Sequence, residues 1–277
     1  MLRDRPAPAF GLVIVGDEIL SGKRVDKHMP QVIELLAERG LSLSWVRYVG
    51  DDRPRLEAVL RDAFASGDIV FSCGGIGATP DDHTRQCAAA ALGVELELHP
   101  EAKALIEERM RDVAREQGQT WAPERSDNQH RLNMGVFPRG ATIIPNPYNK
   151  IPGFSCTGLG QGAVHFVPGF PVMAWPMIES VLEQRYADLF ARQQRREQSV
   201  IVFGAIEAAL TPLMEQIEAS HPEVKVFSLP SVDHPEWGRH VELGVKGPIS
   251  AAETAYADLL AGLRATGASL GPELVRD

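Results

Sequence analysis

The sequence predicts an α/β protein with a mostly parallel sheet, followed by a smaller α+β domain. Two observations predict the larger part: unbroken apolar runs, typical of parallel strands buried on both faces, and amphipathic helices that alternate with them. The runs FGLVIV and DIVFSC lie at 10–15 and 68–73. A third observation predicts the smaller part, because the order after residue 198 changes to strand, helix, strand, strand and helix.

The first 73 residues contain a β, α, β, α, β series. We expect its middle strand at 41–49 and its helices at 28–40 and 53–67. Both helices carry apolar residues at helical spacing and end on a glycine, Gly40 or Gly67. Such helices cross over in a right-handed sense between parallel strands, so ligands are expected beyond the carboxyl ends of the strands.

The segments that follow complete the first domain. Residues 101–118 predict a long charged helix with a narrow apolar stripe, which is typical of a solvated lobe. Strands and turns are expected again at 141–173, and a further helix should run to about residue 190. The polar, basic stretch 191–198 resembles a helix end and a linker. We therefore expect one domain at 1–192 and a second, βαββα, domain at 198–277.

The composition favours small-molecule partners. The chain of 277 residues has a formal net charge of -9, which argues against general binding of nucleic acid or of membrane surfaces. Residues 198–270 contain no basic stripe, and their GxxG sequence, GVKG at 244–247, lies in an expected strand rather than in a loop, so RNA binding in the manner of a KH domain is not expected. The cysteines at 73, 87 and 156 have neither metal-ligand nor disulfide spacing, and no targeting segment is visible. These features predict buried thiols and a cytoplasmic protein.

A glycine turn follows the buried strand at 68–73, within the stretch FSCGGIGATPDDHTR. Glycines permit a positive φ and a close backbone approach, so the N–H groups of this turn can converge on an anion. The candidate anion-binding residues are Ser72, Gly74, Gly75 and Gly77. A helix is expected to begin here, with Thr79 as its N-cap, Pro80 at the first position and Asp82 at the third.

Two adjacent carboxylates, Asp81 and Asp82, stand where the anion would bind. A phosphate and a carboxylate 4 Å apart repel by about 4 kcal/mol at an effective dielectric constant near 20. Either no phosphate binds, or a cation lies between the two groups. Carboxylates of this type hold Mg²⁺ or Mn²⁺ against a substrate phosphate. The alternative is that acidic residues in a first helical turn only complement the helix dipole, and Asp82 already has a capping role available.

Two further loops are candidates. The first of these loops follows the first strand and contains Asp17, Glu18 and Ser21, which should lie at the same sheet edge as the glycine turn. The alternative is that these residues only cap a helix and form a turn. In the loop PNPYNKIPG, Asn146 and Lys150 offer a rigid polar segment and a phosphate partner, although a lone lysine is commonly a solvated charge. Arg85 and Arg131 are candidate phosphate ligands, and the alternative is that they form salt bridges. His83, which follows the two aspartates, is a candidate general base, and the alternative is that it has no catalytic role.

The motifs GDEILSG, VGDD, CGGIGATPDDHTR, FPRGATIIPNP and VPGFP occur in this order and at family-like separations. Together they resemble the MoaB/Mog/CinA-type molybdenum-cofactor-biosynthesis domain over roughly residues 9–190. The form GDELLSG with GGLGPTPDD is the CinA kind. The resemblance implies a three-layer α/β/α fold, strand ends that bind phosphorylated pterins or nucleotides, and a homo-oligomer, either a dimer or a trimer. No counterpart of the amidohydrolase domain of many CinA proteins is expected, so deamidation of nicotinamide mononucleotide is not implied.

The resemblance also implies two activities. CinA-type members resemble metal-dependent pyrophosphatases of ADP-ribose and FAD-type dinucleotides, whereas Mog-type members bind and adenylate molybdopterin. For hydrolysis we expect catalytic carboxylates at Asp81, Asp82 and Asp17, and Mg²⁺, Mn²⁺ or Co²⁺ held by Asp81, Asp82 and Glu18. The expected phosphate or ligand contacts are Ser72, Gly74, Gly75, Gly77, Thr79, Ser21, Asn146, Lys150, Pro168 and Gly169. The alternative is a non-hydrolytic molybdopterin-binding protein.

Two departures from the CinA pattern bear on this choice. Tyr148, Asn149, Lys150 and Ile151 replace part of the usual NPVGTAPG, so Lys150 could add phosphate affinity and Tyr148 could stack on a base or pterin ring. Val172 and Met173 replace the serine and glutamate of PGVPSEM. If that glutamate helps to hold the metal, the replacement favours the non-hydrolytic alternative.

Overall fold

The computed structural model describes residues 8–190 and 195–276. Contacts within the chain group into two compact units, Met1–Phe190 and Ala191–Asp277. Part of the expected linker, 191–194, lies outside the described residues, and its remainder already belongs to a strand, Arg195–Phe203. Among the described residues, no helix is both long and apolar enough to cross a membrane.

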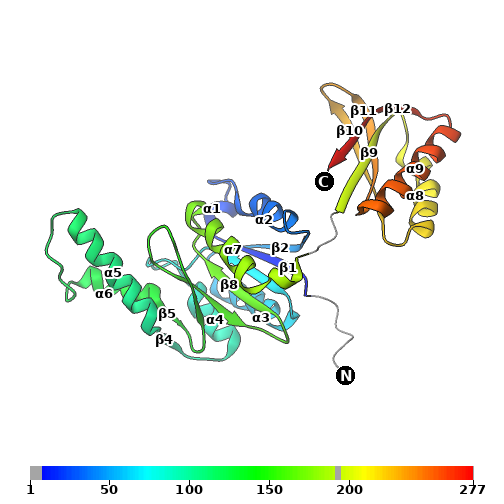
Figure 1. Ribbon diagram of the computed structural model, residues 1–277. Helices are drawn as coiled ribbons and strands as arrows, with labels where there is room; N and C mark the ends of the chain where they lie inside the picture. The colour runs from blue at the N-terminus through cyan, green and yellow to red at the C-terminus, as the bar shows by residue number, and fades with distance from the viewer. Residues whose placement is uncertain (1–7, 191–194, 277) are drawn as a thin grey trace. The chain divides into compact units, whose positions relative to one another are not determined.

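The large unit is built on a six-stranded sheet in the order β2-β1-β3-β8-β7-β6 (Figure 1). Its strands are β1 Phe10–Val15, β2 Leu43–Val49, β3 Ile69–Cys73, β6 Thr142–Ile144, β7 Gly153–Thr157 and β8 Ala163–Val167. The first four in this spatial order pair in parallel, and β7 and β6 add an antiparallel edge. The predicted mostly parallel sheet is therefore confirmed.

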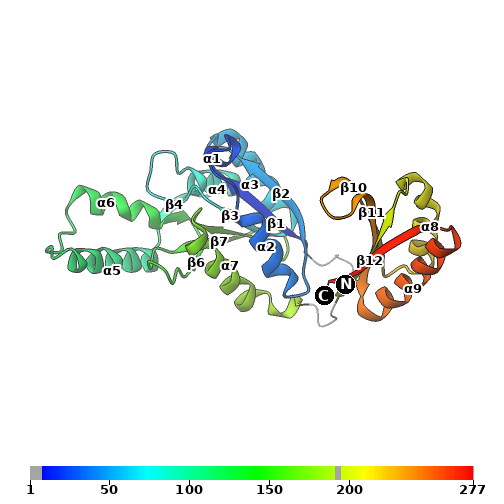
Figure 2. The same cartoon turned by 90° about the horizontal axis from the view of Figure 1, so that it is seen from above.

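Helices cover both faces of this sheet, as Figure 2 shows. One face carries α2 His28–Ala37 and α7 Pro171–Arg185, and the other carries α3 Arg53–Ser66 and α4 Thr84–Leu92. The side chains of β1 alternate between two cores, with Val13 packing toward α3 and Leu12 packing toward α2. This is the three-layer α/β/α arrangement that the sequence resemblance implies. The three cysteines are free and buried, as expected.

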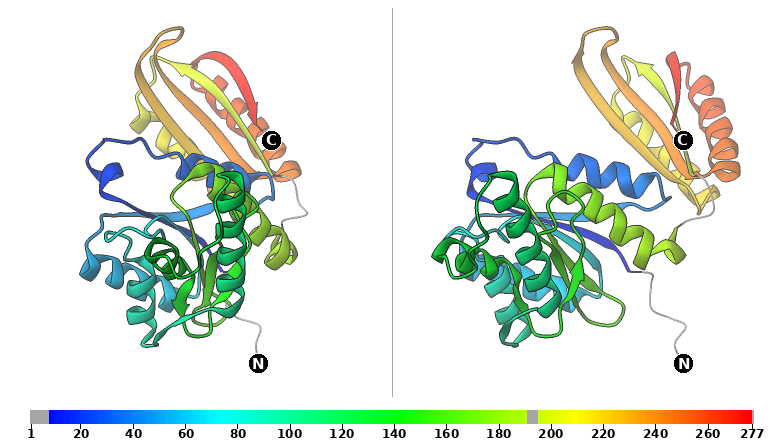
Figure 3. Two further views of the ribbon diagram at one scale, coloured as in Figure 1. Left: turned by 90° about the vertical axis from the view of Figure 1, so that its left-hand side faces the viewer. Right: turned by 60° about the vertical axis from the view of Figure 1, so that its left-hand side comes forward.

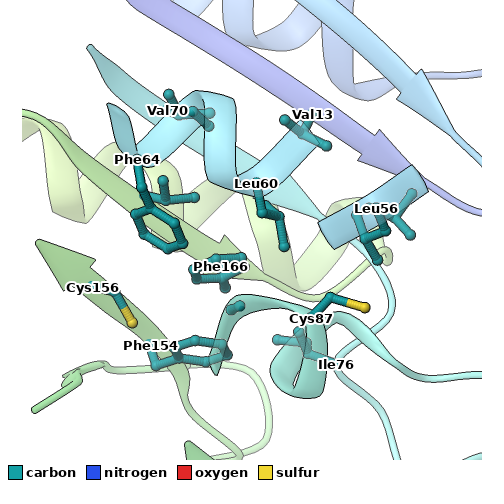
Figure 4. Packing of buried hydrophobic residues seen from close by; sticks show 14 of the residues in the cluster. Val13, Leu56, Leu60, Phe64, Val70, Ile76, Cys87, Phe154, Cys156 and Phe166 are labelled. Atoms are coloured by element: carbon teal, nitrogen blue, oxygen red, sulfur yellow. The ribbon is translucent and has the colours of Figure 1, made fainter. Parts of the chain in front are cut away.

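The helix α3 illustrates how local signals fix an element. Asp52 caps its N-terminus by accepting the Arg55 N–H at 2.9 Å, and Gly67 ends it at a φ of 81°. Leu56 and Leu60, one helical turn apart, pack with Phe64 in the same buried cluster as Phe166 of β8 (Figure 4). The helix is held to the sheet by this apolar stripe.

A helical arm extends from the sheet, with α5 and α6 side by side in Figures 1 and 2. It consists of β4 Leu96–Leu98, α5 Pro100–Glu116, α6 Ser126–Leu132, η1 Asn133–Gly135 and β5 Val136–Pro138. The helix α5 buries Ala102, Ile106 and Met110, one residue per turn, which confirms the narrow apolar stripe. The rest of its surface is solvated. The large unit is completed by two short helices, α1 Asp17–Leu20 and η2 Ala187–Leu189.

The small unit is a four-stranded antiparallel sheet in the order β10-β11-β9-β12, with both of its helices on one face (Figure 3). Its elements are β9 Arg195–Phe203, α8 Glu207–Ser220, β10 Lys225–His234, β11 Gly238–Pro248, α9 Ile249–Ala265 and β12 Ser269–Arg276. The expected βαββα order is confirmed up to α9. The edge strand β12 was not expected, because the glycine and proline inside SLGPELVR are typical of a loop rather than of a strand.

Candidate functional site

Three loops meet at the carboxyl edge of the large sheet, after β1, β2 and β3. The central strand β1 pairs in parallel with both neighbours, and its end aligns Ile14 with Tyr48 and with Cys73. The loops that carry Asp17, Asp51 and the glycine turn therefore leave the same edge. This confirms the expectation that the first loop and the glycine turn face one region.

Asp17 and Asp51 are joined by a reciprocal pair of hydrogen bonds. The Asp17 N–H donates to Asp51 Oδ2 at 3.1 Å, and the Asp51 N–H donates to Asp17 Oδ1 at 3.2 Å. The Gly16 N–H also donates to Val49 O at 3.0 Å. A Cβ on Gly50 would collide with the Asp17 carboxylate, so any larger residue here would displace that carboxylate from its present position. The ends of β1 and β2 thus hold two carboxylates in fixed positions.

The Asp51 carboxyl lies in a field of negative charge. Its pKa is raised, first by partial burial and then by the carboxylates of Asp17, Glu18 and Asp81, while the Asp17 N–H acts in the opposite direction. Sequence reasoning missed Asp51 as a site residue, although VGDD follows a predicted strand at the same sheet edge. That position, directly after a strand next to β1, was the signal that could have identified it.

The glycine turn offers free backbone donors. Gly74 and Gly75 adopt positive φ values of 108° and 67°. The N–H groups of Gly75, Ile76, Gly77 and Ala78 have no acceptor within the part of the chain that the structure describes. Four consecutive unpaired N–H groups beside a sheet edge are suited to an anion such as phosphate.

Buried contacts hold this turn in place. The Thr84 N–H donates to Gly75 O at 3.0 Å, and its hydroxyl donates to Gly74 O at 3.1 Å. Arg85, which is 4% exposed, donates to Ile76 O at 2.6 Å and to Gly77 O at 2.8 Å. Burial lowers the pKa of this guanidinium. The interpretation of Arg85 as a phosphate clamp is therefore wrong, because its donors face the carbonyl oxygens of the turn.

The helix after the turn begins later than the sequence suggests. The helix α4 starts at Thr84, and Thr79 is not its N-cap. Instead, Asp82 Oδ2 accepts the Thr79 N–H at 2.8 Å and the Thr79 hydroxyl at 2.6 Å. This bond closes a separate turn and occupies the Asp82 carboxylate. At the helix start, His83 Nδ1 lies 3.0 Å from Arg53 Nη2.

Asp81 is the exposed carboxylate of this turn. The Thr79 hydroxyl, the backbone N–H of Asp81 itself and His83 together lower the pKa of the Asp81 carboxyl. Asp81 therefore remains ionised at neutral pH. Asp82, in contrast, is less exposed and accepts the Thr79 N–H as well.

The loop at 145–151 is organised by its own contacts. Asn146, which is 4% exposed, donates through Nδ2 to Asn149 Oδ1 and to Ile151 O, and its Oδ1 accepts the Tyr148 N–H. These bonds make Asn146 the organising residue of the loop, and its contact with a ligand stays a prediction. Tyr148 itself is 60% exposed and remains accessible.

Lys150 is paired with acidic residues of the helical arm. Its Nζ lies 2.6 Å from Glu108 Oε1 and 2.7 Å from Asp112 Oδ2, and these two carboxylates raise the pKa of the lysine. Its backbone adopts a positive φ of 66°. Lys150 therefore anchors the loop to α5 in the unliganded protein, and its contact with a phosphate stays a prediction.

The remaining predicted ligand contacts have different settings. Ser72 lies inside β3 with no exposed surface, so it cannot reach a ligand at the edge and its predicted contact is wrong. Ser21 is exposed directly after α1, and its N–H donates to Asp17 O. Pro168 is half-buried at the end of β8. Gly169 lines a cavity of about 460 Å³ beside the edge, and its carbonyl lies 3.0 Å from His28 Nε2.

The carboxylates do not form a closed metal cage. Across residues 8–190 and 195–276, no three His, Cys, Asp or Glu side chains are grouped to hold a metal ion. The predicted trio of Asp81, Asp82 and Glu18 is not brought together, because Asp82 is bonded to Thr79 and the Glu18 carboxylate occupies the space that a Cβ on Gly16 would take. An open site at Asp17 and Asp51 fits better. Mg²⁺ commonly uses one or two carboxylates together with substrate phosphates, and a cation there would relieve the repulsion around Asp51.

Comparison with known proteins identifies the large unit. A family profile described as "Probable molybdopterin binding domain" matches residues 11–188. The chain belongs to this family. A crystal structure of the protein CinA, of unknown function, from Thermoplasma acidophilum is similar to this molybdopterin-binding domain, with 26% identity and a TM-score of 0.54 over 63% of this chain and 97% of that one. The MoaB/Mog/CinA-type resemblance is confirmed.

Two curated relatives of the molybdopterin-binding domain are both called CinA-like proteins. The one from Anaeromyxobacter dehalogenans is 37% identical over 161 residues, which is 58% of this chain and 37% of the relative. The one from Citrifermentans bemidjiense is 32% identical over 203 residues, which is 73% of this chain and 46% of the relative. The chain thus spans less than half of the length of these relatives over the matched region.

Proposed function

We propose that the large unit binds a phosphorylated nucleotide and hydrolyses the diphosphate linkage of ADP-ribose-type or FAD-type compounds with a divalent metal. The observation that carries this proposal is that groups able to bind an anion and groups able to bind a cation lie at the same edge of the sheet. The unpaired N–H groups of 75–78 suit phosphate, and the carboxylates of Asp17 and Asp51 suit a cation. A metal-bridged diphosphate satisfies both.

Each group then has a defined role. Asp17 and Asp51 would hold Mg²⁺, Mn²⁺ or Co²⁺, which supplies charge neutralisation and Lewis acidity at the phosphates. The N–H groups of the glycine turn bind the phosphate oxygens and stabilise the charge that develops on them. Asp81, ionised and exposed, accepts a hydrogen bond from the attacking water and orients it.

A non-hydrolytic role in handling molybdopterin is the second candidate. Two observations favour it: the family profile is that of a molybdopterin-binding domain, and the described carboxylates form no three-ligand metal group. The replacement of a family serine and glutamate by Val172 and Met173 points in the same direction. In this case the glycine turn would bind the phosphate of the pterin without chemistry.

One experiment separates the two candidates. Purified protein is incubated with ADP-ribose or FAD, with Mg²⁺, Mn²⁺, Co²⁺ or a chelator, and the release of AMP is measured. Hydrolysis predicts metal-dependent release that Asp51→Asn and Asp81→Asn reduce by at least roughly a hundredfold, the scale of a lost charge-stabilising group. Asp62→Asn, an exposed change on α3, is the matched control and should retain activity. Binding of molybdopterin without turnover of any diphosphate would instead support the second candidate.

A further inference from the structure

The cavity of about 460 Å³ lies next to the acidic edge and has a volume suited to a small organic ligand. Its floor and walls come from the end of β1, the segment that follows β1, the start of α2, the end of β3 and the start of α7. The lining residues are Ile14, Val15, Glu18, Ile19, Arg24, Val25, Lys27, His28, Cys73, Gly169 and Pro171. Glu18 also contributes to the negative field at Asp51, so the cavity and the acidic edge share a boundary.

Two cations line this cavity without a carboxylate partner. Neither Arg24 nor Lys27 forms an ion pair or a side-chain hydrogen bond with any residue that the structure describes, and both are exposed. The chain carries a net charge of -9, and other lysines, such as Lys150, are paired with carboxylates. Unpaired cations at the mouth of a cavity favour an anionic group there. The neighbouring Lys23 does not line the cavity, which provides an internal control.

The walls behind these cations are mainly apolar. Ile14, Val15 and Cys73 are buried strand residues, whereas Val25 is 83% exposed. An aliphatic lining of this kind favours a flat ring over a sugar or a free ion. The cavity therefore combines an apolar interior with a cationic mouth.

His28 fixes the two sides of the cavity to each other. It is 6% exposed, and its Nε2 lies 3.0 Å from the carbonyl oxygen of Gly169. A carbonyl only accepts, so Nε2 carries the proton and Nδ1 is an acceptor in the neutral ring. This Nδ1 is buried and has no partner among the described residues. His28 thus ties the start of α2 to the backbone just before α7, on the opposite wall of the cavity.

We propose that this cavity binds the heterocyclic ring of a purine or pterin ligand, and that Arg24 and Lys27 hold a phosphate attached to that ring system. The inference rests on the proposed function for the choice of a phosphorylated ligand. It assigns the ring to the cavity, and the phosphate held by Arg24 and Lys27 is the one of the scissile diphosphate that is nearer the ring, at the boundary with the Asp17–Asp51 edge. The purine and the pterin ligand share one chemistry, because each is a planar nitrogen heterocycle that carries N–H groups and a phosphate.

Equilibrium binding of monophosphates tests this assignment independently of catalysis. Isothermal titration calorimetry without metal compares AMP, 6-hydroxymethylpterin phosphate, ribose 5-phosphate and adenosine. The expected result is that AMP or the pterin phosphate binds at least about tenfold more tightly than ribose 5-phosphate, because the ring buries apolar surface. AMP should also bind about tenfold more tightly than adenosine, because adenosine lacks the phosphate that Arg24 and Lys27 hold. Preference for AMP or for the pterin phosphate identifies the source of the ring.

Paired variants locate the binding. Val25→Trp fills the mouth and should remove the advantage of AMP over ribose 5-phosphate, with Val25→Phe as a second blocking variant. Leu159→Trp, a change at another exposed aliphatic residue in the loop between β7 and β8, should leave it intact. Arg24→Ala and Lys27→Ala should each weaken AMP binding about tenfold, and Lys23→Ala should not. Thermal melting of each variant confirms that it is folded.

Two results overturn the assignment: equal affinity for ribose 5-phosphate and both heterocyclic phosphates, or equal effects of Lys23→Ala and Arg24→Ala. AMP contains no diphosphate linkage, so its binding does not depend on hydrolysis. Failure to hydrolyse ADP-ribose would defeat the proposed activity and leave the ring site standing. If ADP-ribose is hydrolysed but AMP shows no advantage over ribose 5-phosphate, the ring site is wrong and the proposed activity stands.

Discussion

Asp17 and Asp51 each accept the backbone N–H of the other, across 34 residues of sequence. The two bonds fix both carboxylates at one sheet edge, where Glu18 and Asp81 add further negative charge and raise the pKa of Asp51. Repulsion among these carboxylates destabilises the unliganded protein, and a bound cation would offset this destabilisation. The arrangement therefore ties the stability of this edge to ligand binding.

The first prediction follows from that charge cluster. Asp51→Asn keeps an oxygen that accepts the Asp17 N–H but removes one negative charge. We expect the variant to melt at the same temperature as the wild type or higher, and to lose the rise in melting temperature that Mg²⁺ gives the wild type. Differential scanning calorimetry with and without Mg²⁺ measures both. Asp62→Asn serves as the control, and an Mg²⁺-dependent rise that persists in Asp51→Asn would contradict the metal assignment.

The second prediction concerns the shape of the glycine turn. Gly75 and Gly93 have nearly identical φ values, 67° and 68°, but a Cβ on Gly75 would collide with Thr84 Oγ1 whereas a Cβ on Gly93 would meet nothing within 4 Å. Both alanine variants bear the left-handed strain of about 1 kcal/mol, and Gly75→Ala should lose roughly 1–3 kcal/mol more from the clash. Urea unfolding compares them. Equal losses would mean that the Thr84 contact does not constrain the turn.

The strongest periodic signals in the sequence placed most of the fold correctly. The strands β1 and β3 and the helices α2 and α3 followed from apolar runs, helical spacing and terminal glycines, which are local properties. The start of α4 was misplaced because Thr79 and Pro80 form a standard cap signal. What overrides it is tertiary: Thr84 closes onto the glycine turn, and Asp82 is drawn to Thr79.

The errors at the site share that origin. Lys150 looked free because its partners, Glu108 and Asp112, lie about forty residues earlier on α5. Asp51 was not named as a site residue, because only the pairing of β1 with β2 shows that it faces Asp17. Residue chemistry predicted the edge where the site lies, but the partner of each charge depended on contacts between distant segments.

The third prediction concerns Arg85 as the brace of the turn. Arg85→Met removes two hydrogen bonds to buried carbonyl oxygens, so we expect a loss of about 2–4 kcal/mol in the free energy of unfolding and weaker phosphate binding. The lysine of Arg85→Lys cannot donate to both carbonyls in the same geometry, so the free energy of unfolding of this variant should lie between those of the wild type and Arg85→Met. Chemical denaturation and phosphate titration give the two readouts. Arg61→Met, an exposed change, should cost less than about 0.5 kcal/mol, and a similar loss in both methionine variants would contradict the bracing role.

The last prediction is a pH dependence set by a buried histidine inside β8. His165 has no exposed surface, and its ring nitrogens lie 2.7 Å from the hydroxyls of Ser155 and Tyr186. Burial, with a smaller effect of Arg185, lowers the pKa of His165 to about 3. An unfolded histidine titrates near pH 6.5, so the unfolded chain binds one more proton than the folded chain between about pH 6.5 and 3.

Stability must therefore fall as the pH drops through this window. From pH 7 to pH 5 the loss caused by His165 should be about 2 kcal/mol, measured by urea unfolding at both values. His165→Gln replaces the ring by a group that does not titrate, so its free energy of unfolding should fall by that much less over the same interval, whatever its stability at pH 7. His130→Gln, a change at an exposed histidine on α6, should keep the wild-type dependence. Equal pH dependence in the wild type and His165→Gln would show that His165 accepts a proton in the folded protein.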